Sequence, residues 1–69
     1  MMTEDHLLAL CRSLGERQTI SLTVEEAEAI FGVCSAPAAT TFLRRSLGDA
    51  VADRLLISDL DGVRITRRS

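Results

Sequence analysis

The C-terminal segment LLISDLDGVRITRRS, residues 55–69, constrains the fold more than any other part of the chain. Two runs rich in β-forming residues flank Asp61-Gly62, a dipeptide that favours a hairpin turn because both residues tolerate positive φ. Upstream, residues 19–22 (TISL) alternate polar and apolar side chains, which is typical of a short strand with one inward face. A strand of four residues needs a partner, so we expect it to join the hairpin as a third strand.

The register of this hairpin is open between two alternatives. A two-residue loop would set Leu60 against Val63 and Asp59 against Arg64. A four-residue loop would instead pair Ser58 with Val63. The turn residues favour a hairpin in either case.

The N-terminal segment has the signals of an amphipathic helix from Thr3 to Leu14. The Thr3 side chain can cap its start, and Gly15 can close its end. Apolar residues recur at i, i+3, i+4 and i+7, which predicts one buried stripe. This stripe consists of Leu7, Leu10, Cys11 and Leu14.

A second helix is expected from Val24 to about Phe31. Thr23 and Glu26 have the spacing of a capping box, in which each side chain bonds the other residue's backbone N–H. Gly32 can supply a left-handed stop. The inner face is expected to contain Val24, Ala27 and Phe31.

A third helix is expected to begin after Ser35, which can cap it, with Pro37 tolerated in the first turn. Gly48-Asp49 either ends this helix or kinks it, with Asp49 capping a further turn through Asp53. The inner face would contain Ala39, Phe42, Leu43 and Leu47, and the outer face Ala38, Thr41 and Arg45, with Arg44 on its flank.

A chain of 69 residues makes one domain, which we take to span residues 1–69. Cys11 and Cys34 lie in apolar surroundings, so free, packed thiols are expected. One His and two Cys lack any ligand spacing, so no metal or cofactor is expected. The start of the sequence lacks the pattern of a signal peptide, and no run suits a membrane span. These features predict a soluble, cytoplasmic protein.

The charge is unevenly distributed along the sequence, although the net charge is only −2. Residues 1–34 carry six acidic residues and two arginines, and residues 35–69 carry four aspartates and six arginines. The chain has no lysine, and arginine is the better residue for forked contacts with phosphate or guanine. A GC-rich genome would explain the same arginine usage equally well.

The predicted order of helix, strand, helix, helix and hairpin resembles the winged helix–turn–helix family over nearly the whole chain. The matching segments are DHLLALCRSL, TISL, VEEAEAIF, GVC, SAPAATTFLRRSL and LLISDLDGVRITRR. The resemblance implies an α+β fold: a small, divergent three-helix winged-helix-like domain with a short strand and a C-terminal β-hairpin. It also implies a third helix in the major groove and a hairpin that touches the DNA backbone or minor groove.

Transferred to this sequence, the resemblance implies a DNA-binding transcriptional regulator that acts as a homodimer on duplex DNA. The residues implied to face DNA on the third helix are Ala38, Thr41, Arg44 and Arg45. The implied phosphate contacts of the hairpin are Arg64, Arg67 and Arg68.

An alternative function is a non-enzymatic protein-interaction module, such as a phage-type inhibitor of a nucleic-acid-processing complex. The acidic face of Glu25, Glu26 and Glu28 would suit a basic protein surface. The four glycines are scattered singly, so the chain has no phosphate-binding loop. It also has no recognisable catalytic set, and we expect neither an enzyme nor a small-molecule substrate.

Overall fold

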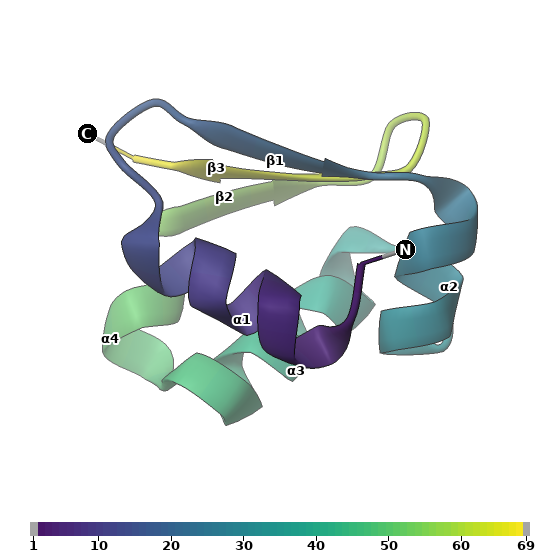
Figure 1. Ribbon diagram of the computed structural model, residues 1–69, viewed down its shortest axis with the longest axis horizontal. Coiled ribbons are helices and arrows are strands. Elements are labelled where there is room, and N and C mark those ends of the chain that lie inside the picture. Colours follow the sequence, from purple (N-terminus) through teal and green to yellow (C-terminus); the bar gives the residue numbers. More distant parts are fainter. Residues whose placement is uncertain (1, 69) are drawn as a thin grey trace.

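The computed structural model describes residues 2–68 and shows a small α+β domain (Figure 1). Its helices are α1 (Glu4–Ser13), α2 (Val24–Phe31), α3 (Ala36–Leu47) and α4 (Asp49–Ala52), and its strands are β1 (Thr19–Leu22), β2 (Leu55–Ser58) and β3 (Val63–Arg67). The expectation of three helices is therefore wrong by one short helix. Gly48 interrupts the helical path, and Asp49 begins α4 instead of capping it, since no side chain caps this helix.

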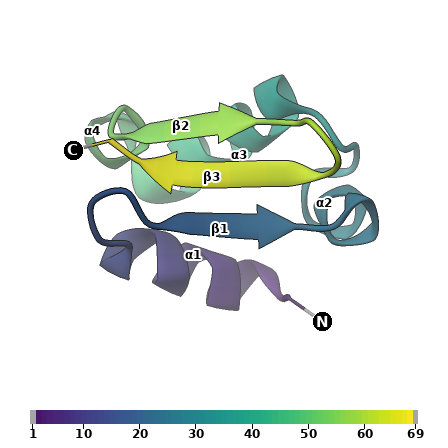
Figure 2. The same cartoon turned by 90° about the horizontal axis from the view of Figure 1, so that it is seen from above.

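The three strands form one antiparallel sheet in the order β1-β3-β2, which confirms the predicted pairing of residues 19–22 with the hairpin. All four helices lie on one face of this sheet, and the view from above shows the other face uncovered (Figure 2). Ile20, Ile57 and Ile65 are partners across the three strands. The alternation of the strands points these residues toward the helices and leaves Ser21, Ser58 and Arg64 on the uncovered face.

Both predicted hairpin registers are wrong, because Ser58 pairs with Arg64. The turn itself forms as predicted, with positive φ at Asp61 and Gly62. Two long-range contacts explain the difference. Val63 is held against Leu22 of β1, and Asp59 leaves the β2–β3 ladder to accept a hydrogen bond from the backbone N–H of Ala36 at 2.7 Å.

Helix α1 begins as predicted, with the Thr3 hydroxyl accepting from the backbone N–H of His6 at 3.1 Å. It does not end at Gly15. The C-cap is Leu14 in an extended conformation, which turns the Leu14 side chain into the core. The left-handed residue of the following turn is Arg17, with φ of 64°.

Helix α2 has the predicted capping box and stops at Gly32, whose φ is 85°. Its inner face differs from the prediction at two positions. Val24 is 48% exposed, and Ile30 is buried together with Ala27. Only a narrow stripe of this short helix meets the core, and Val24 lies in its first turn, beside the sheet edge.

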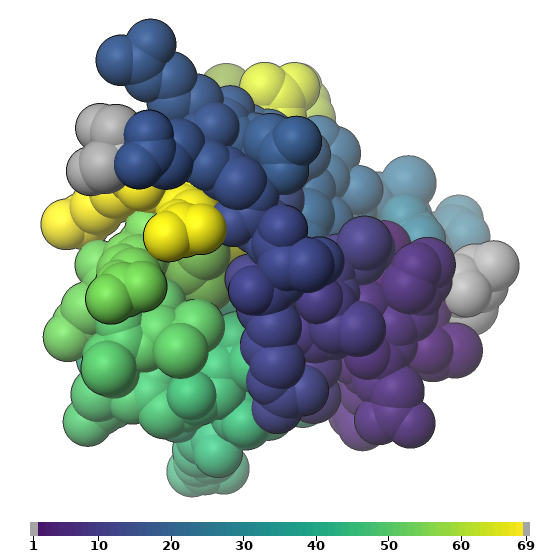
Figure 3. Space-filling view, turned by 60° about the vertical axis from the view of Figure 1, so that its left-hand side comes forward, coloured from purple at the N-terminus to yellow at the C-terminus, as the bar shows by residue number. Residues whose placement is uncertain are grey.

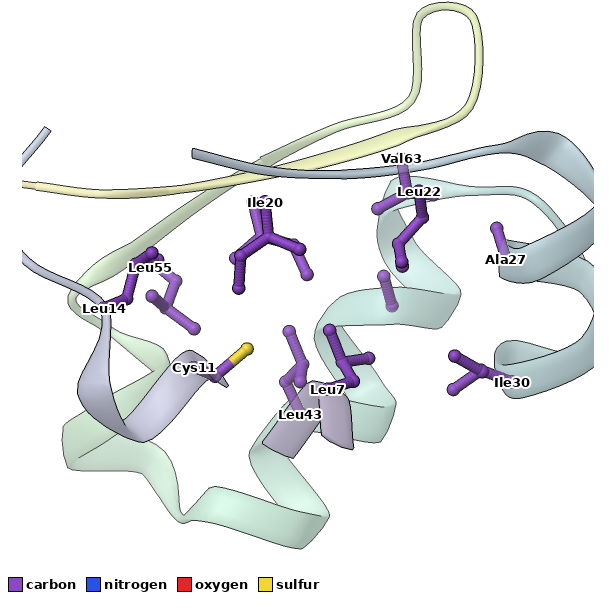
Figure 4. Packing of buried hydrophobic residues seen from close by; sticks show 12 residues of the cluster. Leu7, Cys11, Leu14, Ile20, Leu22, Ala27, Ile30, Leu43, Leu55 and Val63 are labelled. Carbon is purple, nitrogen blue, oxygen red and sulfur yellow. The ribbon is translucent and has the colours of Figure 1, made fainter. Parts of the chain in front are cut away.

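The core lies between the sheet and the helices α1, α2 and α3 (Figure 4). Its most completely buried large side chains are Leu7, Leu43, Val63 and Ile65. At one side of this core, the Phe31 and Phe42 rings pack edge to face, with centroids 5.3 Å apart. Burial of these side chains joins the sheet to the helices, so the hairpin is part of the core rather than an appended arm.

Both cysteines are free thiols, which confirms the prediction; Cys11 is buried and Cys34 is half-buried. No helix within residues 2–68 is long and apolar enough to cross a membrane.

Candidate nucleic-acid interface

The N-terminus of α3, which the resemblance would direct into DNA, is already occupied by side chains of this chain. The Ser35 hydroxyl accepts from the backbone N–H of Ala38 at 3.1 Å. The Asp59 carboxylate accepts from the backbone N–H of Ala36 at 2.7 Å. A carboxylate therefore sits at the positive end of the α3 dipole, where a DNA phosphate would otherwise be favoured.

Farther along α3, the predicted outer face is present but carries little free charge. Thr41 and Arg45 are exposed, and Ala38 is half-buried. Arg44 forms ion pairs with Asp53 at 2.7 Å and with Asp49 at 3.2 Å. The hydrogen bonds and charge of Asp53, and then those of Asp49, raise the pKa of Arg44. The positive charge of Arg44 is thus compensated by two carboxylates from the start and end of α4.

The three predicted phosphate contacts of the hairpin do not form one group. Arg64 lies on the uncovered face of the sheet, between Ser21 and Ser58. The Arg67 guanidinium donates from Nη1 to the Leu14 carbonyl at 2.8 Å, which ties the end of β3 to the end of α1. Arg68 is exposed beyond the end of β3. Arg64 therefore lies apart from Arg67 and Arg68, which lie together at the end of β3.

Five of the eight arginines instead belong to segments that meet at the end of the molecule opposite the hairpin turn, namely the end of α1, the α1–β1 turn, the α4–β2 junction and the end of β3 (Figure 1). We call this surface the basic end; its residues are Arg12, Arg17, Arg54, Arg67 and Arg68. In Figure 3 the blue α1–β1 turn, the green α4 segment and the yellow end of β3 meet there. Within residues 2–68, the one arginine in an ion pair is Arg44, so the arginines of the basic end have no carboxylate partner.

Backbone hydrogen bonds hold the segments of the basic end together. The Arg17 N–H donates to the Arg67 carbonyl at 3.1 Å, and the Arg68 N–H donates to the Arg54 carbonyl at 2.8 Å. Sequence analysis missed this grouping, because Arg12 and Arg17 belong to the acidic half of the chain. The available signal was the pairing of residues 19–22 with the hairpin, which brings the start of β1 to the end of β3.

Seven of the ten acidic residues belong to the start of α1, to α2 and to the β2–β3 loop, segments that lie toward the other end of the molecule (Figure 1). We call this surface the acidic end; its residues are Glu4, Asp5, Glu25, Glu26, Glu28, Asp59 and Asp61. Two of these carboxylates have structural roles. Asp59 bonds to α3, and Glu26 accepts from the Thr23 N–H at 3.0 Å and the Met2 N–H at 3.2 Å.

The hydrogen bond from Thr23, followed by that from Met2, lowers the pKa of Glu26. Of the predicted partner-binding acids, Glu25 and Glu28 are exposed, whereas the Glu26 carboxylate is occupied. Two large apolar side chains of this end are also exposed, Val24 at 48% and Leu60 at 78%.

A cavity of about 370 Å³ lies beside the basic end, between α3, α4 and β2. Its polar lining comes from Thr40, Arg44, Asp53 and Arg68. Across the described part of the chain, no three His, Cys, Asp or Glu side chains converge in a group that could hold a metal ion. The arrangement offers charged groups for binding.

Comparisons with protein-family models, with curated proteins and with solved structures found no match to this chain.

Proposed function

We propose that this chain is a winged-helix domain that binds duplex DNA and has no enzymatic role. The helix–strand–helix–helix–hairpin order and the sheet order β1-β3-β2 support the winged-helix part of this proposal. The observation that carries the DNA-binding part is the basic end, where five arginines gather without a carboxylate partner in residues 2–68. Arginine is well suited to phosphate, because its planar guanidinium can donate two parallel hydrogen bonds.

In this proposal the phosphate contacts come from Arg12, Arg17, Arg54 and Arg68, and the acidic hairpin turn points away from the DNA. Arg67 is left out of this set because its side chain is half-buried and held toward the end of α1, whereas the other four are exposed. Thr41 and Arg45 of α3 are the candidates for contacts with base edges. A homodimer would present two such ends to two half-sites, and sedimentation of the protein with and without DNA tests that expectation.

A salt series with random-sequence duplex DNA, followed by fluorescence anisotropy, tests the proposal. Four phosphate contacts give a slope of log K against log salt of roughly −3.6, and removal of two arginines would leave roughly −1.8. We expect the smaller slope for a variant that combines Arg17→Gln with Arg68→Gln.

The matched control is Arg64→Gln, which removes one charge from the uncovered face of the sheet. This control should keep the slope of the unchanged protein, whereas Arg68→Gln alone should make the slope smaller by about 0.9. Equal losses in these two single variants, or the absence of DNA binding at low salt, would overturn the proposal.

The exposed apolar side chains of the acidic end favour one second candidate, a module that binds a basic protein surface. Val24 and Leu60 would supply the apolar contact, and Glu25 and Glu28 the charge. The test is capture from nuclease-treated lysate with the unchanged protein and with a variant that combines Leu60→Ser and Glu28→Gln. A basic protein retained by the first and lost by the second supports this candidate, and equal retention contradicts it.

A further inference from the structure

A second cavity, of about 230 Å³, opens at the basic end between α1, α4 and the adjacent ends of β2 and β3. It is distinct from the cavity beside α3, and only Leu55 lines both. Its lining residues are Cys11, Arg12, Val51, Arg54, Leu55 and Arg67. Three of these are arginines, and no carboxylate of the described chain lines the cavity. We call it the arginine pocket.

The arginines of this pocket are attached to fixed parts of the fold. Arg67 Nη1 donates to the Leu14 carbonyl at 2.8 Å, which orients the guanidinium and uses only one of its five N–H donors. The Arg54 backbone is bound on both sides, because its N–H donates to the Val51 carbonyl at 3.1 Å and its carbonyl accepts from Arg68. Arg12 lies in the last turn of α1. A fixed scaffold of this kind lowers the conformational entropy that the protein loses when a ligand binds.

Among the residues that the structure describes, no acidic side chain lines the pocket. The Asp53 carboxylate, adjacent to Arg54 in sequence, is bonded to Arg44 at 2.7 Å. Burial raises the pKa of the Cys11 thiol, so this group stays uncharged near neutral pH and adds no negative charge. Three arginines around one cavity, with no carboxylate among the lining residues, favour an anion with several oxygens.

We propose that the arginine pocket binds a phosphate monoester group, with the guanidinium groups on its oxygens and Val51 and Leu55 against the carbon beside the ester. A dianionic, three-oxygen end group matches several forked donors better than the singly charged diester of a DNA backbone. The pocket is smaller than the roughly 300–1,000 Å³ of sites for drug-sized ligands, so it suits a phosphate and an adjoining sugar. Two sources carry this chemistry, a 5′-phosphorylated DNA end and a small phosphorylated molecule.

The first measurement is a titration of the whole protein with inorganic phosphate at constant ionic strength, followed by backbone amide NMR. We expect saturable shifts at Arg12, Arg54 and Leu55. Arg54→Gln should weaken this binding by about tenfold or more. Arg17→Gln removes the same charge from the basic end but not from the pocket, and it should leave phosphate binding nearly unchanged.

The second measurement compares two duplexes of one sequence, with a 5′-phosphate or a 5′-hydroxyl at the ends. A preference for the phosphorylated duplex that Arg54→Gln removes and Arg17→Gln retains identifies the DNA end as the source. Saturable phosphate binding without that preference identifies a small phosphorylated molecule, and this outcome stands even if the protein binds no DNA. Absence of saturable phosphate binding, or equal weakening by the two variants, would overturn the proposal.

Discussion

Replacement of Gly62 by alanine should destabilise the domain far more than the same replacement at Gly32. Gly62 lies in the hairpin loop with φ of 106°, where it passes the junction of β1 and α2. A Cβ atom at this position would stand 2.2 Å from the Leu22 carbonyl oxygen. Gly32 also has positive φ, 85°, but a Cβ atom there would meet nothing within 4 Å. The two positions therefore share the conformational penalty and differ in the steric one.

The expected magnitudes follow from these two terms. The left-handed conformation costs an alanine about 1–2 kcal/mol, and its lower entropy in the unfolded chain offsets part of that cost. We therefore expect Gly32→Ala to lose about 1 kcal/mol of unfolding free energy. At Gly62 the added Cβ atom and the Leu22 carbonyl oxygen must move about 1 Å farther apart to reach a normal carbon–oxygen contact. This displacement falls beside the Leu22–Val63 pair, and overpacking of this kind typically costs a further 1–3 kcal/mol.

Urea unfolding followed by circular dichroism at the helix band measures both variants. For a domain of this size each kcal/mol corresponds to a shift of roughly 4–8 °C in Tm, so thermal melts give a second reading. We expect Gly62→Ala to lose about 3 kcal/mol in total, with an unchanged dependence on urea concentration. Equal losses for the two variants would refute the close packing of the hairpin loop on the β1–α2 junction.

Three further changes test other contacts of the fold. Asp53→Asn should release Arg44 from its shorter ion pair, with little effect on stability because the pair is exposed. It should steepen the salt slope of DNA binding by about 0.9. An unchanged slope would contradict the idea that Asp53 compensates the charge of Arg44. The pKa of Glu26 in the folded protein lies below its ordinary value of 4.5, so its stabilising contribution is complete above pH 4.5 and is lost as the pH falls through the folded-state pKa. Acid unfolding of Glu26→Gln should therefore show a flatter pH dependence in that window, and identical pH profiles would count against the capping role. Asp59→Ala removes the acceptor of the Ala36 N–H and should lower the unfolding free energy by about 1 kcal/mol. Asp59→Asn keeps an acceptor oxygen and should lower it less. Similar losses for the two variants in chemical denaturation would argue against this contact.

The parts of the fold that the sequence predicted well are those with local causes. The capping box of α2 uses Thr23 and Glu26, three residues apart, and the stop at Gly32 uses one residue's freedom at positive φ. The positions of β1 and the hairpin likewise follow from alternation and from the turn preference of Asp61-Gly62. Such signals act over a few residues, and tertiary packing did not override them here.

The parts that failed depend on contacts between distant segments. The hairpin register was decided by Leu22 of β1 and by the hydrogen bond of Asp59 to α3, neither of which is visible in the hairpin sequence. The placement of the arginines predicted to face DNA depends on such contacts too. Whether an arginine is free or paired depends on which carboxylate the fold brings to it, and Arg44 meets Asp53 only because α4 folds back after Gly48.

The separation of charge along the molecule matters more for binding than its net charge of −2. The longest dimension is 27 Å, and the screening length is about 8 Å at physiological ionic strength, so a phosphate at the basic end feels little of the acidic end. At about 10 mM salt the screening length grows to roughly 30 Å, and the whole molecule, with its negative net charge, then acts on the DNA. The gain in DNA affinity on lowering the salt should therefore flatten near this concentration. A variant of the acidic end, Glu25→Gln with Glu28→Gln, should keep a linear plot of log K against log salt down to this concentration, because its net charge is zero. A plot that stays straight for the unchanged protein would mean that the two ends do not act as separate charges.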